Sequence, residues 1–231
     1  MEDKIKGIVI GSIDYKEKSK IVYLYTPNGK ESVLAGGAKS IKGGMLGFTN
    51  TLNYVEYVKT NSKLPKLVEY NIIESYYDLS NSLDKMKIIT IIIQVLNNIN
   101  DISFHSSIFN FLIFILNELK KENSKNKLIL AVFLTKMLSA FGAQPSFNTC
   151  VRCNMKNLPA FLSIEEGGMV CNICSPISNL ENYNIIKKLY QTKSKNIDDF
   201  DVDCNLDDLL SNLYKFYQYH IHLNLKKYWH L

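Results

Sequence analysis

Short runs of β-branched and aromatic residues, separated by turn residues, occupy the chain from Lys4 to Asp78. Such runs are typical of β-strands. The five runs are KIKGIVIGSI, KIVYLYT, ESVLAGGA, TLNYVEYVKT and KLVEYNIIESYY. Thr26-Pro27-Asn28-Gly29 separates the second run from the third, and a proline followed by Asn-Gly favours a tight hairpin turn. The pattern predicts a small five-stranded barrel over residues 1–79.

Beyond Ser80 the apolar positions recur at the spacing of an α-helix and form longer segments. The predicted helices cover residues 83–99, 104–122, 127–141, 181–192 and 206–227. The most apolar runs fall short of the roughly 18 to 20 residues that a membrane span needs. We therefore expect an α+β fold without a transmembrane helix, in which a helical domain over residues 80–231 follows the barrel.

Four of the five cysteines form the pattern C-x2-C-x17-C-x2-C, through Cys150, Cys153, Cys171 and Cys174. Two such pairs, each on a tight turn, can direct four thiolates at one zinc ion. The intervening AFLSIEEGGMV is typical of two short strands about a Glu-Gly-Gly turn, so we predict a zinc-binding insertion over residues 149–175. A four-thiolate site has no open position for water, and zinc there is structural. The alternative of four incidental thiols stays open at this point.

No catalytic arrangement is evident in the sequence. On a helix the side chains of His220 and His222 diverge by about 200°, which argues against a metal pair. His105 and His230 have no carboxylate or thiol at motif spacing, and no serine or cysteine nucleophile stands out, Cys204 included. The segment GGAKSIKGG lacks the G-x-x-x-x-G-K-[ST] pattern of a phosphate-binding loop. We therefore expect a protein that is not an enzyme.

Lysine and arginine total 27 against 22 acidic residues, a formal charge of +5 that suits a polyanionic partner. The first dozen residues lack the apolar core of a secretory signal, so we expect a cytoplasmic protein. A glycine-rich loop over residues 36–47 follows the third run, and loops of this kind tend to contact ligands. Six lysines are expected around one end of the barrel: Lys16, Lys18, Lys20, Lys30, Lys39 and Lys42.

Five tyrosines interleave with these lysines: Tyr15, Tyr23, Tyr25, Tyr54 and Tyr57. An exposed aromatic surface with a basic rim can hold single-stranded nucleic acid, because bases stack on the rings and phosphates meet lysine. The same tyrosines would equally well belong to a hydrophobic core with the lysines solvated around it. The pattern alone supports these two interpretations equally.

Four segments together resemble the RecO family of bacterial recombination mediators, and the resemblance covers essentially the whole chain. The segments are IKGIVIGSIDYKEKSKIVYLYTPNGK, GGAKS, LSAFGAQPSFNTCVRC and AFLSIEEGGMVCNIC. The resemblance implies an N-terminal OB-fold followed by a helical domain that carries a zinc finger. It also implies binding of single- and double-stranded DNA, annealing of complementary strands without ATP, and help in loading RecA. The implied partners are RecR and the C-terminal tail of single-stranded DNA-binding protein, with nucleoid association during repair.

Within this resemblance, the loop lysines Lys39 and Lys42 are the first candidates for DNA contact, and the other four of the six lysines come next. Lys226 and Lys227 near the C-terminus are further candidates. The loop is commonly richer in arginine in this family, and lysine neutralises phosphate without the bidentate fork of a guanidinium. A zinc-ribbon scaffold or regulator whose barrel binds a protein is the alternative. DNA affinity that falls steeply with salt would favour the mediator.

Overall fold

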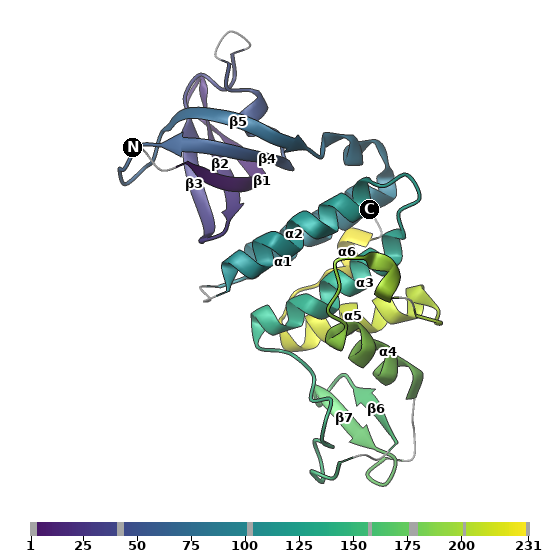
Figure 1. Ribbon diagram of the computed structural model, residues 1–231. Coiled ribbons are helices and arrows are strands. Elements are labelled where there is room, and N and C mark those ends of the chain that lie inside the picture. The colour runs from purple at the N-terminus through teal and green to yellow at the C-terminus, as the bar shows by residue number, and fades with distance from the viewer. Residues whose placement is uncertain are drawn as a thin grey trace. The chain divides into compact units, whose positions relative to one another are not determined.

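The computed structural model describes residues 4–40, 44–100, 104–156, 159–175, 180–200 and 202–229. The chain divides into two compact units (Figure 1). The first unit comprises Met1–Met86 and Asp101–Lys120, and the second comprises Lys87–Asn100 and Lys121–Leu231. The domain boundary at residue 80 stays a prediction.

The first unit contains a five-stranded antiparallel sheet, which confirms the predicted strand content (Figure 1). The strands are β1 (Ile5–Tyr15), β2 (Ser19–Thr26), β3 (Gly29–Ala35), β4 (Asn53–Lys59) and β5 (Leu67–Ser75), in the order β3-β2-β1-β4-β5. A single bridge between Leu34 and Lys66 joins the β3 side of the sheet to the β5 side, so the sheet is not fully closed into a barrel. The predicted hairpin is confirmed, because Thr26 pairs with Gly29 and Gly29 adopts a φ of +109°.

Both faces of this sheet bury apolar side chains. The inner face contributes Val9, Val22 and Leu24 to a core that also includes Phe48, which follows β3 in a 3-10 segment. Helix α2 (His105–Lys120) packs on the outer face, where Tyr25 is fully buried. The hydroxyl of Tyr25 lies 2.9 Å from Nδ1 of His105, and the ring of Tyr54 packs edge-on against Phe109. At the far end of α2, the Tyr76 hydroxyl donates a hydrogen bond of 2.7 Å to Oδ1 of Asn117. The outer face of the sheet is therefore a second core, shared with α2.

The second unit is helical. Its helices are the C-terminal part of α1 (Leu83–Asn98), then α3 (Asn126–Met137), α4 (Leu180–Gln191), α5 (Leu206–His220) and α6 (Lys226–Trp229). Short 3-10 segments lie at Gly47–Thr49, Tyr77–Asn81, Leu138–Phe141 and Ile197–Phe200. Helix α3 is the centre of this unit, because nine of its twelve residues are buried and it contacts both α4 and α5. The Tyr217 hydroxyl of α5 donates 2.8 Å to the carbonyl of Leu134.

The prediction of one helix over residues 206–227 was wrong. Helix α5 ends at His220, and a separate helix α6 begins at Lys226. His222 adopts a φ of +58°, and the carbonyl of Tyr217 accepts hydrogen bonds from the N–H groups of both Ile221 and Leu223. A left-handed residue just past the last turn is a common way to end a helix. The turn that follows buries Leu225, and this burial is not visible in the helical periodicity.

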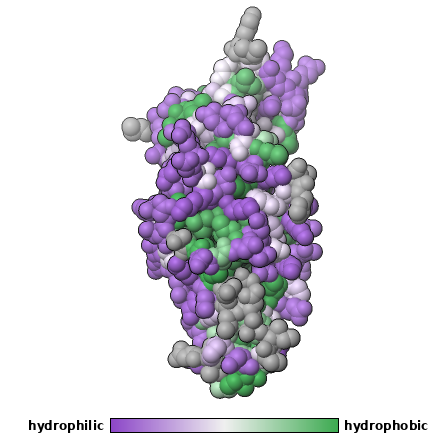
Figure 2. Space-filling model, turned by 90° about the vertical axis from the view of Figure 1, so that its right-hand side faces the viewer, coloured by the Kyte–Doolittle hydropathy of each residue, from purple (hydrophilic) through white to green (hydrophobic). Residues whose placement is uncertain are grey.

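Hydrophilic side chains cover most of the face shown in Figure 2, and hydrophobic residues gather there in separate patches. Among the described residues, no helix is both long enough and apolar enough to span a bilayer.

Candidate metal centre and nucleic-acid interface

The four cysteines of the repeated C-x2-C pattern come together at one point. Their Sγ atoms all lie within 4.8 Å of one another, and those of Cys153 and Cys171 are 3.7 Å apart. Four thiolates arranged tetrahedrally at 2.3 Å from a zinc ion are separated by about 3.8 Å. All the cysteines are free thiols, so disulfides do not account for the cluster. The donor set and its spacing therefore fit a tetrahedral thiolate-bound metal, as the repeated C-x2-C pattern predicts.

Two chain segments build this cluster. The first is the turn from Cys150 to Asn154, in which Asn154 has a φ of +58° and its N–H donates 2.9 Å to the carbonyl of Cys150. The second follows the predicted hairpin, which is confirmed as β6 (Ala160–Ser163) paired with β7 (Gly168–Cys171). The N–H of Cys171 donates to Sγ of Cys150 over 3.4 Å, which links the two segments. Both turns thus present sulfur inward, as the two-residue spacing requires.

The thiols do not ionise alike. Burial of Cys150 opposes ionisation, yet hydrogen bonds from the N–H groups of Cys171, Cys153 and Arg152 together lower its pKa to about 6. The pKa of Cys174 is raised to about 12, because its thiol hydrogen-bonds to Cys153 and lies beside other sulfurs. One thiolate therefore forms readily in this cluster, and each further one is opposed by the charge already present. A divalent cation removes that opposition.

Arg152, the sole arginine of the chain, links the segments that surround the four-cysteine cluster. Its Nε and Nη2 donate to the Glu166 carboxylate, with distances of 3.0 Å and 2.7 Å to Oε1. Its Nη1 donates 2.9 Å to the carbonyl of Cys174. One side chain thus connects the first cysteine turn, the tip of the β6–β7 hairpin and the second cysteine turn. Such outer contacts orient metal ligands. This role of Arg152 was not predicted from the sequence, although its position within C-V-R-C was a signal.

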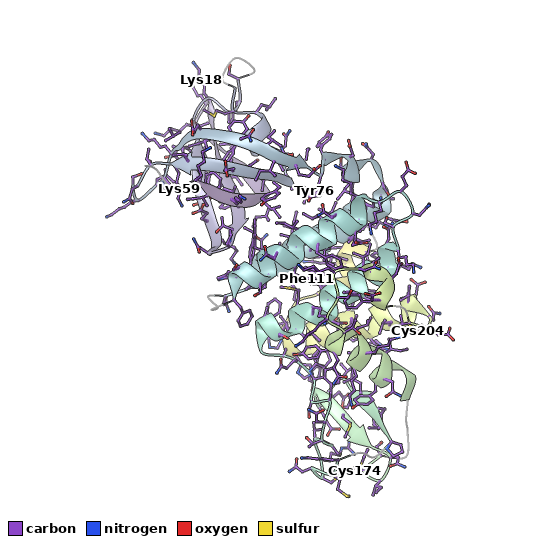
Figure 3. The ribbon with its side chains drawn as sticks, in the orientation of Figure 1. Lys18, Lys59, Tyr76, Phe111, Cys174 and Cys204 are labelled. Carbon is purple, nitrogen blue, oxygen red and sulfur yellow. The ribbon has the colours of Figure 1, made fainter. Side chains whose placement is uncertain are left out.

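The tip of the β1–β2 hairpin carries the other candidate site. Tyr15 pairs with Ser19, so Lys16, Glu17 and Lys18 form the turn, and Lys16 adopts a φ of +55°. Both turn lysines are exposed, and Figure 3 labels Lys18 at this tip. The side chain of Lys16 lies over the Tyr15 ring, with Nζ 5.5 Å from the ring centre.

Lys39, from the loop after β3, is bound to this hairpin tip. Its backbone N–H donates to the carbonyl of Lys18 over 3.3 Å, and its Nζ donates 3.1 Å to the carbonyl of Lys16. The same Nζ lies 2.9 Å from Oδ2 of Asp14, and Lys20 lies 3.9 Å from Oδ1 of that carboxylate. The hydrogen bond from Lys39 holds the pKa of Asp14 below its usual value. Two segments of the chain therefore place four lysines together, which we call the hairpin-tip cluster (Lys16, Lys18, Lys20, Lys39).

The remaining lysine candidates lie elsewhere. Lys30 pairs with Tyr25, whereas Lys20 pairs with Ala35 at the other end of β3, so the prediction that all six lysines surround one end of the sheet was wrong for Lys30. The tight β2–β3 turn places Lys30 at the start of β3, a full strand length from the hairpin tip. Lys42 lies outside the described residues. Lys226 and Lys227 are exposed at the start of α6 in the second unit, and Nζ of Lys227 lies 4.7 Å from the Tyr228 ring centre.

The tyrosines divide between the two interpretations of the sequence. Tyr25 and Tyr57 are buried, the first under α2 and the second in the inner core. Tyr54 packs on α2 through Phe109. Tyr23 is 38% exposed on the outer face, and Tyr15 is partly exposed at the hairpin tip. A core role is therefore confirmed for most of the stripe, and the exposed aromatic surface is small.

Comparisons with known proteins agree with this architecture. Residues 1–76 match the family described as "Recombination protein O N terminal", and residues 80–228 match "Recombination protein O C terminal". The chain belongs to the RecO family of recombination proteins. It is 27% identical over 223 residues to the DNA repair protein RecO of Caldicellulosiruptor saccharolyticus. The matched region covers 93% of this chain and 91% of that protein.

Two further members of the RecO family show similar levels of identity. The DNA repair protein RecO of Clostridium novyi is 28% identical over 201 residues, 84% of this chain and 78% of the relative. That of Halalkalibacterium halodurans is 27% identical over 176 residues, 75% of this chain and 69% of the relative. Membership of the RecO family assigns the chain to DNA repair and recombination.

Proposed function

We propose that this chain is a recombination mediator that binds single- and double-stranded DNA and anneals complementary strands without hydrolysing a nucleotide. The observation that carries the proposal is the hairpin-tip cluster, in which the loop lysine Lys39 is hydrogen-bonded to the turn that carries Lys16 and Lys18. Two DNA strands repel each other, and a basic surface that binds both strands displaces counterions and lowers that barrier. Annealing of this kind needs positive charge and no catalytic group.

We propose zinc as the metal of the four-cysteine cluster. Thiolate ligands select soft or borderline cations, and a closed tetrahedral set is typical of structural zinc. Cys150, Cys153, Cys171 and Cys174 would hold the ion, which would supply structural order and no reaction chemistry. This assignment agrees with a non-enzymatic function.

Membership of the RecO family also supports three finer proposals. We propose RecR and the C-terminal tail of single-stranded DNA-binding protein as protein partners, and loading of RecA as the outcome of their joint action. Among the candidate DNA contacts predicted from the sequence, we propose the hairpin-tip cluster first, together with Lys42, three residues after Lys39. Lys226 and Lys227 come second. Lys30 is left out, because it lies at the opposite end of the sheet.

The proposed function is tested by annealing and binding assays on the purified full chain. Complementary oligonucleotides should join faster with the protein than without it, in the absence of ATP. Binding of a labelled oligo(dT) should weaken steeply with salt. Each lysine–phosphate contact adds about 0.7 to the salt slope for a single strand, which is about 5-fold in affinity at 0.1 M salt. Replacing both Lys16 and Lys18 with alanine should therefore weaken binding by up to about 25-fold.

A charge-matched control removes Lys6 and Lys30, which lie at the opposite end of the sheet. That double variant should bind nearly as the parent does. Equal losses in both double variants would place the DNA contact away from the hairpin tip. If the parent shows no binding, or binding that is insensitive to salt, the mediator function is wrong and a scaffold that binds protein is favoured.

A further inference from the structure

A pocket of about 590 Å³ lies in the second unit, where the cysteine-bearing segment meets helix α4. Its lining comes from both sides: Phe147, Asn148, Lys156, Pro159 and Met169 from the cysteine-bearing segment, and Tyr183, Asn184 and Lys187 from α4. This volume is within the range of pockets that bind small ligands or parts of larger ones. None of the lysines predicted from the sequence lines it.

The pocket has an apolar floor and a polar rim. Phe147, Met169 and Tyr183 are 7%, 3% and 6% exposed, so their side chains form the floor. Asn148 and Asn184 are exposed on the rim. Because these side chains are nearly fully buried, a ligand would chiefly contact the amide and ammonium groups of the rim, and the rings offer little face for stacking.

The charge of this pocket is entirely positive. Its two charged lining residues are Lys156 and Lys187, and no carboxylate is among the lining residues. Within the part of the chain that the structure describes, neither lysine forms an ion pair, whereas Lys39 lies 2.9 Å from the Asp14 carboxylate. Two ammonium groups at one concave site without a counter-charge attract an anion.

Neighbouring contacts hold both lysines in place. The Tyr183 hydroxyl donates 2.6 Å to the carbonyl of Phe147, and Nζ of Lys187 lies 3.4 Å from that hydroxyl oxygen. The backbone of Lys156 pairs with Thr149, and the N–H of Cys150 donates 3.0 Å to the carbonyl of Met155. The same turn that presents Cys150 and Cys153 therefore fixes the position of Lys156.

We propose that this pocket binds the phosphodiester backbone of nucleic acid. The inference rests on the proposed function and adds a second DNA contact, on the second unit. Ammonium and amide groups suit phosphate oxygens, and the small exposed area of the rings predicts little dependence on base sequence. The pocket accepts single strands and duplexes, because both present the same phosphodiester groups. Its integrity depends on the metal centre, since the cysteine turn positions Lys156.

The test compares two double variants of the full chain in a salt titration with labelled oligo(dT) and with a duplex. Replacing Lys156 and Lys187 with alanine should lower the slope by up to about 1.4 for oligo(dT) and about 1.8 for the duplex, and should weaken oligo(dT) binding up to about 25-fold at 0.1 M salt. The control replaces Lys193 and Lys195, two exposed lysines of the same unit that do not line the pocket. The control variant should keep the slope of the parent.

A second variant guards against loss of folding. Asn184→Asp keeps the size of the side chain and adds a negative charge to the rim, in the first half of α4, where acidic residues are compatible with the helix dipole. It should weaken DNA binding with an unchanged zinc content and thermal midpoint. In ¹⁵N-labelled protein, the side-chain amides of Asn148 and Asn184 should shift on addition of oligo(dT) and remain unshifted with inorganic phosphate alone at the same phosphate concentration.

The outcomes separate the two proposals. If the parent binds DNA and the Lys16/Lys18 variant is weakened while both pocket variants bind as the parent does, the pocket inference is overturned and the proposed function stands. Amide shifts with inorganic phosphate but not with DNA would also overturn it. If the parent binds no DNA, the proposed function fails as well.

Discussion

Asp14 reduces the positive potential of the proposed DNA surface. Its carboxylate lies 2.9 Å from Nζ of Lys39 and 3.9 Å from Nζ of Lys20, and its side chain is 68% exposed. A phosphate that approaches these lysines has to compete with a carboxylate that is already present. We therefore predict that Asp14→Asn, which keeps the shape of the side chain, tightens DNA binding.

The size of the effect follows from one unit of charge. Freeing one lysine for one phosphate adds about 0.7 to the salt slope on a single strand, or about 5-fold in affinity at 0.1 M salt. Fluorescence anisotropy with labelled oligo(dT) at several salt concentrations measures both quantities. In the combined variant Asp14→Asn/Lys39→Ala the gain in DNA affinity should largely disappear, because the Lys39 ammonium that Asp14→Asn frees is then absent.

Asp78→Asn provides the matched control, since it removes the same charge from an exposed residue in the 3-10 segment after β5. Unchanged affinity in Asp14→Asn would refute the reasoning. Equal gains in the two single variants would also refute it, because net charge and not the local ion pair would then set the affinity. In the DNA complex the pKa of Asp14, now lowered by Lys39, should rise towards its ordinary value of 3.8 as Lys39 turns to phosphate.

Three other predictions concern the metal centre and the core. Replacing Cys150 and Cys153 with serine should reduce bound zinc to none, as measured by a chelator dye on acid-released metal; full zinc content in that variant would contradict the assignment. Arg152→Lys removes the bidentate contact with Glu166 and should weaken zinc binding by about 10-fold, measured by competition with a chelator, whereas equal affinity would show that Arg152 does not orient the ligands. Burial raises the pKa of Tyr76 to about 12, so the folded chain retains a proton that the unfolded chain loses near pH 10. The free energy of unfolding should therefore fall as pH rises between these two pKa values. Urea denaturation at several pH values should show a smaller fall for Tyr76→Phe than for the parent. An identical fall in the two proteins would refute this role of Tyr76.

The sequence was most informative where the signal was local. Strand alternation, the Pro-Asn-Gly turn and the paired C-x2-C turns each depend on neighbouring residues, and the five strands, the hairpins and the clustering of Cys150, Cys153, Cys171 and Cys174 all agree with prediction. The end of α5 at His220 was missed, because the burial of Leu225 that accompanies it is a tertiary effect.

The burial and neighbours of individual side chains were less predictable, because they depend on contacts between segments that are distant in sequence. Tyr23 and Tyr25 share a face of β2, yet Tyr25 is buried since His105 of α2, eighty residues later, covers it. Lys30 was predicted at the same end of the sheet as Lys39. Strand β3 lies between the two residues in sequence, so Lys30 is at the opposite end of that strand from the loop that carries Lys39. The ion pair of Lys39 with Asp14 could not be predicted from spacing either, as twenty-four intervening residues separate the two.

The packing of α2 against the sheet has a practical consequence for dissecting the chain. A fragment that stops at residue 79 would end just after the last strand and would lack the helix that covers Tyr25 and Tyr54. Such a truncation would expose an apolar sheet surface to water, and exposed sheets of this kind self-associate. Studies of the isolated sheet would therefore require a redesigned boundary that carries residues 105–120 along, with a short linker in place of α1.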